Sequence, residues 1–204
     1  MRRPFSFEEI AIDHVSRFGE PDEATLPDDI REIYETSRTK LGFVPNVFRA
    51  YAKRPEHFRA FMHYHDVLMK GPSNLTRAER EAIVVAVSAE NECQYCVTSH
   101  GAALRILGKD PILADQIAIN WQTANTTPRL DAILTFASRV NERGFAASDE
   151  EIEDLRDVGF SDDDIWDIAA IAAFFGFSNR MAGALDMRPN AEFYAMGRPS
   201  SPSK

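Results

Sequence analysis

The chain has 204 residues, a formal net charge of −9 at pH 7 and only two cysteines. This length suits one domain that buries about 70% of its unfolded surface. The negative charge argues against nucleic acid or an anionic membrane as a partner, because both need a basic protein face. Two cysteines are too few for a secreted disulfide framework, so a Cys-x-x-Cys pair indicates a catalytic or metal-binding role in a reducing compartment.

No segment has the composition of a secretory signal or a membrane span. The N-terminal arginines are followed by Glu8 and Glu9, where a secretory signal would need a long apolar run. The apolar runs 83–89 and 165–177 are shorter than the roughly eighteen residues that a transmembrane helix needs. We therefore expect a soluble, cytoplasmic protein.

The first third of the chain predicts an arm followed by three helices. Residues 1–24 are mixed in composition and are expected to form an extended or loosely attached arm. Apolar residues at helical spacing then predict helices that begin at Asp28, at Asn46 after Pro45, and at Pro55. Gly42 is expected to end the first of these helices, and a Gly-Pro-Ser-Asn turn at 71–74 the third.

Capping boxes, in which Ser or Thr is followed three residues later by an acid, indicate three later helix starts at Thr76, Ser148 and Ser161. Further helices are expected over 112–119 and from Pro128 to a stop at Gly144. No segment shows the alternation of a strand. The predicted fold class is all-α, with a helical domain over 25–188 and a polar tail over 189–204.

A shift of the chain by 85 positions indicates a degenerate internal repeat. In this register Thr76 meets Ser161, Asn91 meets Gly176, Cys93 meets Ser178, and His100 meets Leu185. The second copy would keep the helices without the reactive side chains.

The reactive residues gather in one stretch that contains both cysteines. His100 follows Cys96 by four residues, so on a helix the thiol and the imidazole share one face. A thiolate is the reactive form of cysteine, and a nearby imidazole or helix N-terminus favours that form. We expect Cys96 to attack a peroxide, giving a sulfenic acid that Cys93 converts to a disulfide.

Glu81 is the candidate carboxylate that would orient or recharge the histidine. On one unbroken helix Glu81 and Cys96 would be about 22 Å apart, too far for any contact. The helix must therefore break between them. We expect the break at Asn91, because asparagine tolerates a left-handed turn, and this would leave Cys93 at a new helix start.

The stretch resembles the E-x11-C-x2-C-x3-H pattern of alkylhydroperoxidase D-like proteins in the carboxymuconolactone decarboxylase superfamily. The pattern residues here are Glu81, Cys93, Cys96 and His100. The segment 44–48 and the helix around 179–180 look like those of the peroxidase-related branch, so the resemblance covers residues 40–188.

This resemblance implies an all-helical trimer or hexamer that reduces hydroperoxides with a lipoylated or thioredoxin-like dithiol partner. It implies Cys96 as the attacking thiol, Cys93 as the resolving thiol, His100 as the proton acceptor and Glu81 as the relay. One position departs from the pattern. Tyr95 stands where the best-studied branch has a histidine, and a tyrosine hydroxyl does not serve as a base at pH 7.

Other interpretations of the cysteines stay open. Free cysteine is among the most buried residue types, so the pair would also suit a core position. A zinc site would need a fourth ligand beyond Cys93, Cys96 and His100. Covalent haem attachment needs a histidine directly after the second cysteine, where Val97 stands, so it is excluded. We expect no metal and no cofactor.

Two other functions would use the same chain differently. A decarboxylase-like or hydrolytic enzyme would need no sulfur, and a redox-sensing module would change its assembly state on oxidation with negligible turnover. His63 and His65 flank Tyr64, so we expect one packed and one exposed imidazole. The aromatic residues of 174–177 are interpreted first as part of the core or of a subunit interface. An apolar mouth for an organic peroxide is the weaker alternative.

Overall fold

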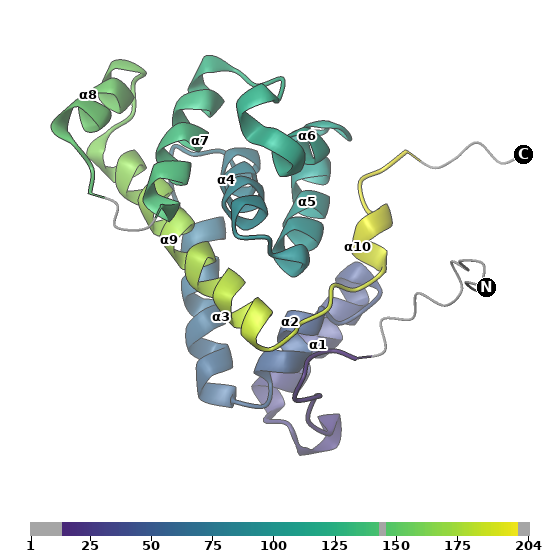
Figure 1. Cartoon of the computed structure of the whole chain (residues 1–204). Helices are drawn as coiled ribbons and strands as arrows, with labels where there is room; N and C mark the ends of the chain where they lie inside the picture. Colours follow the sequence, from purple (N-terminus) through teal and green to yellow (C-terminus); the bar gives the residue numbers. More distant parts are fainter. Residues whose placement is uncertain (1–13, 143–145, 200–204) are drawn as a thin grey trace, which may run out of the picture.

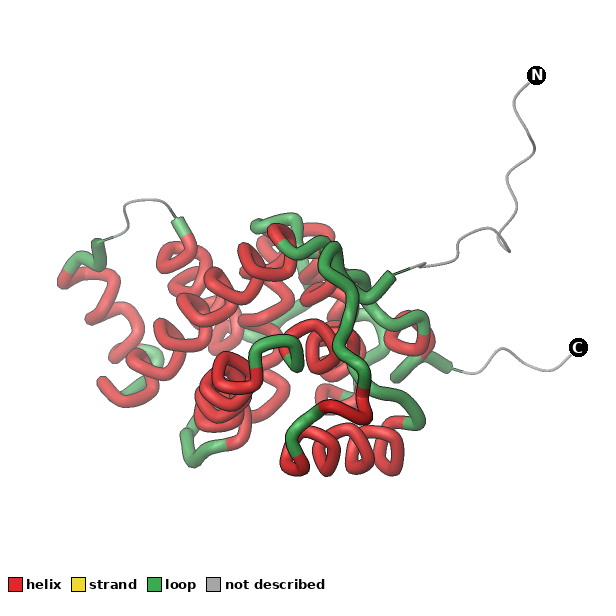
Figure 2. The backbone as a smooth tube through the Cα atoms, turned by 90° about the horizontal axis from the view of Figure 1, so that it is seen from below, coloured by secondary structure: helices red, strands yellow, loops and turns green. Residues whose placement is uncertain are grey.

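The computed structural model describes residues 14–142 and 146–199, and every regular element in these residues is a helix (Figure 1). The predicted all-α class is therefore confirmed, and Figure 2 shows the same helices joined by loops. The elements in chain order are η2 (Glu23–Thr25), α1 (Asp28–Leu41), α2 (Asn46–Tyr51), α3 (Pro55–Lys70), α4 (Arg77–Glu90), α5 (Gln94–Gly108), α6 (Leu113–Asn120), η3 (Trp121–Thr123), α7 (Pro128–Asn141), α8 (Asp149–Asp157), α9 (Asp162–Ala184) and α10 (Glu192–Ala195).

Local capping explains why the helices begin where they do. The side chains of Thr76, Ser148 and Ser161 each accept a hydrogen bond from the backbone three residues on, and the acid there accepts one in return. All three predicted capping boxes are confirmed. Gly42 ends α1 with φ of 85°, a conformation that glycine adopts without strain. The predicted stop at Gly144 lies outside the described residues.

Helix α4 is the centre of the molecule. Its residues 82–87 have no exposed surface, because α5, α6, α7 and α9 pack around it (Figure 1). A helix that is apolar on all sides is stable only when it is covered on all sides. The main apolar core forms around this run.

A second, smaller apolar core joins α1 and α2 to the start of α3 and to the beginning of α5. Phe58 and Ile30 are almost completely buried in it, and both cysteines belong to the same cluster. The dithiol therefore lies where the N-terminal helices meet the bundle around α4.

The described part of the N-terminal arm packs against the domain. Val15 is buried, the Arg17 N–H donates to the Leu185 carbonyl, and the Arg188 N–H donates to the Val15 carbonyl. The sequence predicts an extended or loosely attached arm over 1–24, and residues 1–13 of it lie outside the described residues. The described part is held by backbone hydrogen bonds to a remote segment, which no local pattern signals.

The segment after residue 188 also contacts the domain. Phe193 of α10 is buried, and the guanidinium of buried Arg105 donates to the carbonyl oxygens of Phe193 and Met196 at 2.9 Å each. The predicted limits of arm, domain and tail stay predictions. The internal repeat is also unconfirmed, since α9 runs unbroken through Gly176, whereas α4 stops at Glu90, just before Asn91.

Buried Arg80 joins the end of α3 to the start of α4. It donates to the carbonyl oxygens of Leu68, Gly71 and Leu75 at 2.8, 2.9 and 3.2 Å. We expect Arg80→Leu to lower the free energy of unfolding by about 3 kcal/mol, because it leaves these buried acceptors without a donor. Urea unfolding measures this. Arg77→Leu, at an exposed site in the same turn, is expected to change stability by less than about 0.5 kcal/mol.

Candidate active site

A tight turn between α4 and α5 creates the site. Helix α4 ends at Glu90, and Cys93 caps the N-terminus of α5, so the predicted break is present. The predicted left-handed conformation of Asn91 is wrong, since its φ is −84°, and the residue with positive φ is exposed Glu92 at 55°. The Asn91 amide instead donates to the side-chain oxygens of Asn141 and Asn179, which holds the turn against α7 and α9.

This turn folds α5 back along α4 and brings Glu81 to His100. The His100 Nδ1 lies 2.7 Å from the Glu81 Oε2, and the two side chains are only 18% and 12% exposed. When Glu81 is ionised, Nδ1 must carry the proton of this hydrogen bond, which leaves Nε2 free to accept one. The predicted pairing of a remote acid with the imidazole is present in the structure.

The two thiols are buried and reduced. Cys93 is 7% exposed and Cys96 2% exposed, and neither forms a disulfide. The Cys96 Sγ lies 3.9 Å from the Ser178 Oγ of α9. Among the described residues, no hydrogen bond joins the His100 ring to either sulfur. Direct proton transfer from Cys96 to His100 therefore stays a prediction.

The two thiols differ in acidity. A hydrogen bond from the Cys96 thiol, with backbone N–H groups of the first turn of α5, lowers the pKa of Cys93 to about 6 against the cost of burial. The hydrogen bond to Cys93 and burial raise the pKa of Cys96. The two opposite shifts favour the thiolate on Cys93 over Cys96. The assignment of Cys96 as the attacking thiol stays a prediction, and these shifts favour Cys93 as the attacking thiol.

Tyr95, the residue that departs from the family pattern, connects two segments. Its buried hydroxyl accepts a hydrogen bond from the Val47 N–H at 3.0 Å, and burial raises its pKa. It therefore positions the start of α5 against α2 and does not act as a base. Asn46, which precedes Val47, holds the same segment to the C-terminal part of the chain. Its side-chain N–H donates to the Arg188 carbonyl, and its backbone N–H donates to the Asn190 Oδ1.

Sequence reasoning missed two α9 side chains that line the thiols. Ser178 contacts Cys96, and a hydrogen bond from Asn179 helps to lower the pKa of Cys93. Asn179 also donates to the Ser88 hydroxyl at 2.9 Å, which fixes α9 against α4. The shift of 85 positions had paired Ser178 with Cys93, but it carried no sign that the two segments would be in contact.

His65 of α3 is a second imidazole close to the site. Its ring centroid is 6.1 Å from that of His100, and its Nδ1 is 3.1 Å from the Asp66 carboxylate. The His65 hydrogen bond lowers the pKa of Asp66 to about 2. His63 is exposed and His65 is half-buried, so the prediction of one packed and one exposed imidazole is confirmed.

In the part of the chain that the structure describes, no three His, Cys, Asp or Glu side chains are placed to hold a metal ion. None of the helices in residues 14–142 and 146–199 has the length and hydropathy needed to span a membrane.

The fold and the site define an all-helical protein with a Cys-x-x-Cys pair at a helix start and a Glu–His pair behind it. The profile of the Carboxymuconolactone decarboxylase family matches residues 55–139. The crystal structure described as an alkylhydroperoxidase AhpD core, an uncharacterized peroxidase-related protein from Ralstonia eutropha JMP134, is 53% identical with a TM-score of 0.89. That match covers 91% of this chain and 97% of the other.

A peroxidase-related protein from Silicibacter sp. TM1040 is 41% identical with a TM-score of 0.82, over 85% of this chain and 91% of that one. The chain therefore belongs to the AhpD-like, peroxidase-related proteins of the carboxymuconolactone decarboxylase family, as its sequence motif predicted. The debrominase Bmp8 shares the fold at 21% identity and a TM-score of 0.73, over 90% of this chain and 95% of that one. No curated protein matches the chain.

Proposed function

We propose that this protein reduces hydroperoxides through a dithiol–disulfide cycle of Cys93 and Cys96. A thiolate attacks the terminal peroxide oxygen, the O–O bond breaks, and the alcohol leaves after taking a proton. The second thiol attacks the resulting sulfenic acid, so that an S–S bond forms and water leaves. An external dithiol then reduces the disulfide and is itself oxidised. The observation that carries the proposal is the buried pair of free thiols at a helix N-terminus, in which hydrogen bonds lower the pKa of Cys93.

The Glu81–His100 pair would handle the protons of this cycle. Each turnover must protonate an alkoxide and remove a proton from the second thiol. The imidazolium form of His100 would donate the first proton from Nε2. The neutral ring left behind would then take the proton of the second thiol and pass it to the departing hydroxide, which leaves as water. Glu81 keeps Nδ1 protonated and stabilises the imidazolium when it forms. The 2.7 Å contact between the two side chains supports this role.

The reductant, the assembly state and the location belong to the same proposal. A lipoylated or thioredoxin-like protein would supply the dithiol, a trimer or hexamer would be the working assembly, and the cytoplasm would keep the pair reduced. The family relationship supports these expectations.

Thiol titration before and after one equivalent of an alkyl hydroperoxide tests the cycle. We expect two thiols per chain to disappear and a dithiol such as dihydrolipoamide to restore both, because the described cysteines form one pair. Loss of a single thiol, or no loss at all, would contradict the cycle.

The same samples separate the proposal from its alternatives. A redox sensor would change its oligomeric size on oxidation without steady turnover, which sizing chromatography and continuous peroxide consumption would show. A decarboxylase-like or hydrolytic activity would survive in a variant with both cysteines replaced by serine.

A further inference from the structure

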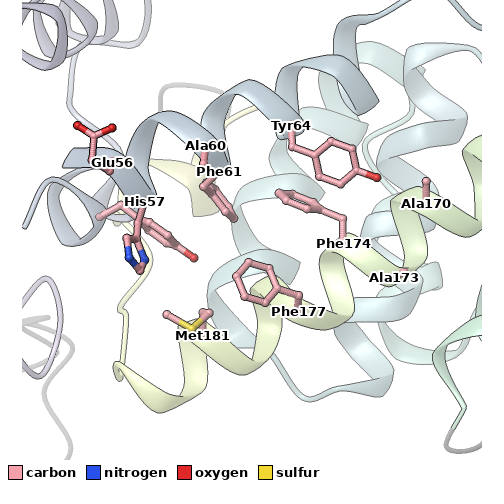
Figure 3. A pocket seen from close by; sticks show the side chains of 11 residues that line it. Glu56, His57, Ala60, Phe61, Tyr64, Ala170, Ala173, Phe174, Phe177 and Met181 are labelled. Carbon is pink, nitrogen blue, oxygen red and sulfur yellow. The ribbon is translucent and has the colours of Figure 1, made fainter. Parts of the chain in front are cut away.

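An apolar cavity of about 830 Å³ lies between α3 and α9 (Figure 3). One of its lining residues, Tyr51, belongs to the smaller apolar core that contains Cys93 and Cys96. Its volume is in the range of small-molecule sites, and such sites are apolar with a few placed polar groups. Figure 3 shows Phe61 and Tyr64 of α3 facing Phe174 and Phe177 of α9. The other lining residues are Tyr51, Glu56, His57, Ala60, Ala170, Ala173 and Met181.

The wall of the cavity is aromatic. The Phe61 and Phe174 rings are 5.1 Å apart between centroids, and Tyr64 meets Phe174 edge-on at 5.4 Å. Phe177 is half-exposed at the rim, although phenylalanine is usually buried. Rings at such distances and angles form a surface on which a flat or bulky apolar group packs well.

Tyr51 supplies a polar group without a partner. The residue is 7% exposed, and within the described residues its hydroxyl has no hydrogen-bond partner. A buried hydroxyl without a partner costs free energy, so it marks a position where a bound molecule would supply the missing acceptor. Burial raises the pKa of Tyr51 to about 12, which keeps its hydroxyl a donor at neutral pH.

Tyr51 also joins the cavity to the thiols. Its ring stacks on Phe61 at 4.4 Å, and it belongs to the same buried cluster as Cys93 and Cys96. On the other side, Phe61 and Phe174 contact His65, whose ring is next to His100.

We propose that this cavity binds the organic group of a bulky apolar, aromatic hydroperoxide, and that the Tyr51 hydroxyl donates a hydrogen bond to the ligand's oxygen. The inference rests on the proposed function for the peroxide itself, and it adds a substrate class and a binding residue. The aromatic walls recognise the hydrocarbon, and Tyr51, which shares a buried cluster with both cysteines, binds the oxygen.

The binding step can be measured without turnover, using two inert ligands of one shape. 2-Phenylpropan-2-ol is the alcohol product of cumene hydroperoxide, and isopropylbenzene is its analogue without oxygen. We expect the reduced, full-length protein to bind both in calorimetry, with the alcohol favoured. Tyr51→Phe keeps the ring and removes the hydroxyl, so it should weaken the alcohol about fivefold and leave isopropylbenzene unchanged.

Two exposed aromatic residues of α9 give a test of the cavity wall and its matched control. Phe177→Ala removes a cavity wall and should weaken both ligands about tenfold. Trp166→Ala removes a larger and more exposed ring outside the cavity, and it should change neither ligand by more than about twofold.

Equal effects of Tyr51→Phe on both ligands, or no binding of either ligand, would overturn the inference. So would sizing chromatography that shows Phe177→Ala dissociating an oligomer, together with no ligand binding, since the cavity would then be covered by a second copy. Ligand binding with the predicted Tyr51 effect but no peroxide reduction would support the site and refute the proposed function. Peroxide reduction without ligand binding would support the proposed function and refute the binding site.

Discussion

Replacing Cys93 with serine is expected to lower hydroperoxide turnover with an external dithiol by at least about 10³-fold. The reason is electrostatic: hydrogen bonds lower the pKa of Cys93 while the pKa of Cys96 is raised, so the thiolate is favoured on Cys93. The variant should also lose the thiolate absorbance that appears as the pH rises through about 6.

Cys96→Ser is the matched comparison. It should also lose turnover, because the sulfenic acid can no longer become an intramolecular disulfide. Its serine keeps a hydroxyl donor for Cys93, so the chain should still form one sulfenic acid per equivalent of hydroperoxide. If Cys93→Ser forms the sulfenic acid and Cys96→Ser does not, Cys96 is the attacking thiol, as the sequence motif implied.

The lowered pKa of Cys93 also predicts a pH dependence of stability. Its folded pKa lies below the ordinary value of 9.0, so the unfolded chain binds more protons between about pH 6 and pH 9. The free energy of unfolding of the reduced protein should therefore rise across this window, and the contribution is lost as the pH falls through about 6. Above pH 9 the raised pKa of Cys96 acts in the opposite direction. Cys93→Ser should remove the rise, which chemical unfolding at several pH values would show.

Glu81→Gln is the second substitution with a large expected effect, a fall in turnover of about 10²-fold. Glutamine has nearly the same shape, but it carries no charge to stabilise the imidazolium, and its amide can present a donor to Nδ1. Steady-state peroxide consumption at neutral pH measures this fall.

Glu92→Gln gives a charge-matched control for Glu81→Gln. Glu92 lies in the turn before Cys93, is exposed, and has no place in the Glu81–His100 hydrogen bond. It is expected to change turnover by less than about twofold. A similar loss in both variants would mean that net charge near the turn, and not the orientation of His100, controls the rate.

Helix boundaries were predictable because their signals are local. The Thr76, Ser148 and Ser161 caps each use side chains within three residues, so their chemistry can be read without knowing the fold. The burial of α4 was predictable for a related reason, since an uninterrupted apolar run must be covered on all sides.

The turn at 91–93 shows where local reasoning became insufficient. Its existence followed from the distance between Glu81 and Cys96, but its conformation did not, because the Asn91 amide is held by α7 and α9. Glu92 takes the positive φ where a sequence rule favoured asparagine. Tertiary hydrogen bonds from remote helices outweigh an intrinsic preference that is worth only about 1–2 kcal/mol.

The amino-acid sequence by itself determined the helical class, the helix starts and the set of Glu81, Cys93, Cys96 and His100, since capping, periodicity and motif spacing are all encoded over short stretches. Tertiary structure alone decided which thiol is acidic and which unpartnered hydroxyl lines the aromatic cavity. The acidity of Cys93 depends on a hydrogen bond from Cys96, on Asn179 and on burial by separate helices. Tyr51 shares a buried cluster with the thiols only because α2 packs on α3, α3 on α9, and α9 on α5. Such energies arise from groups that are distant in the chain and close in space, so no window of sequence contains them.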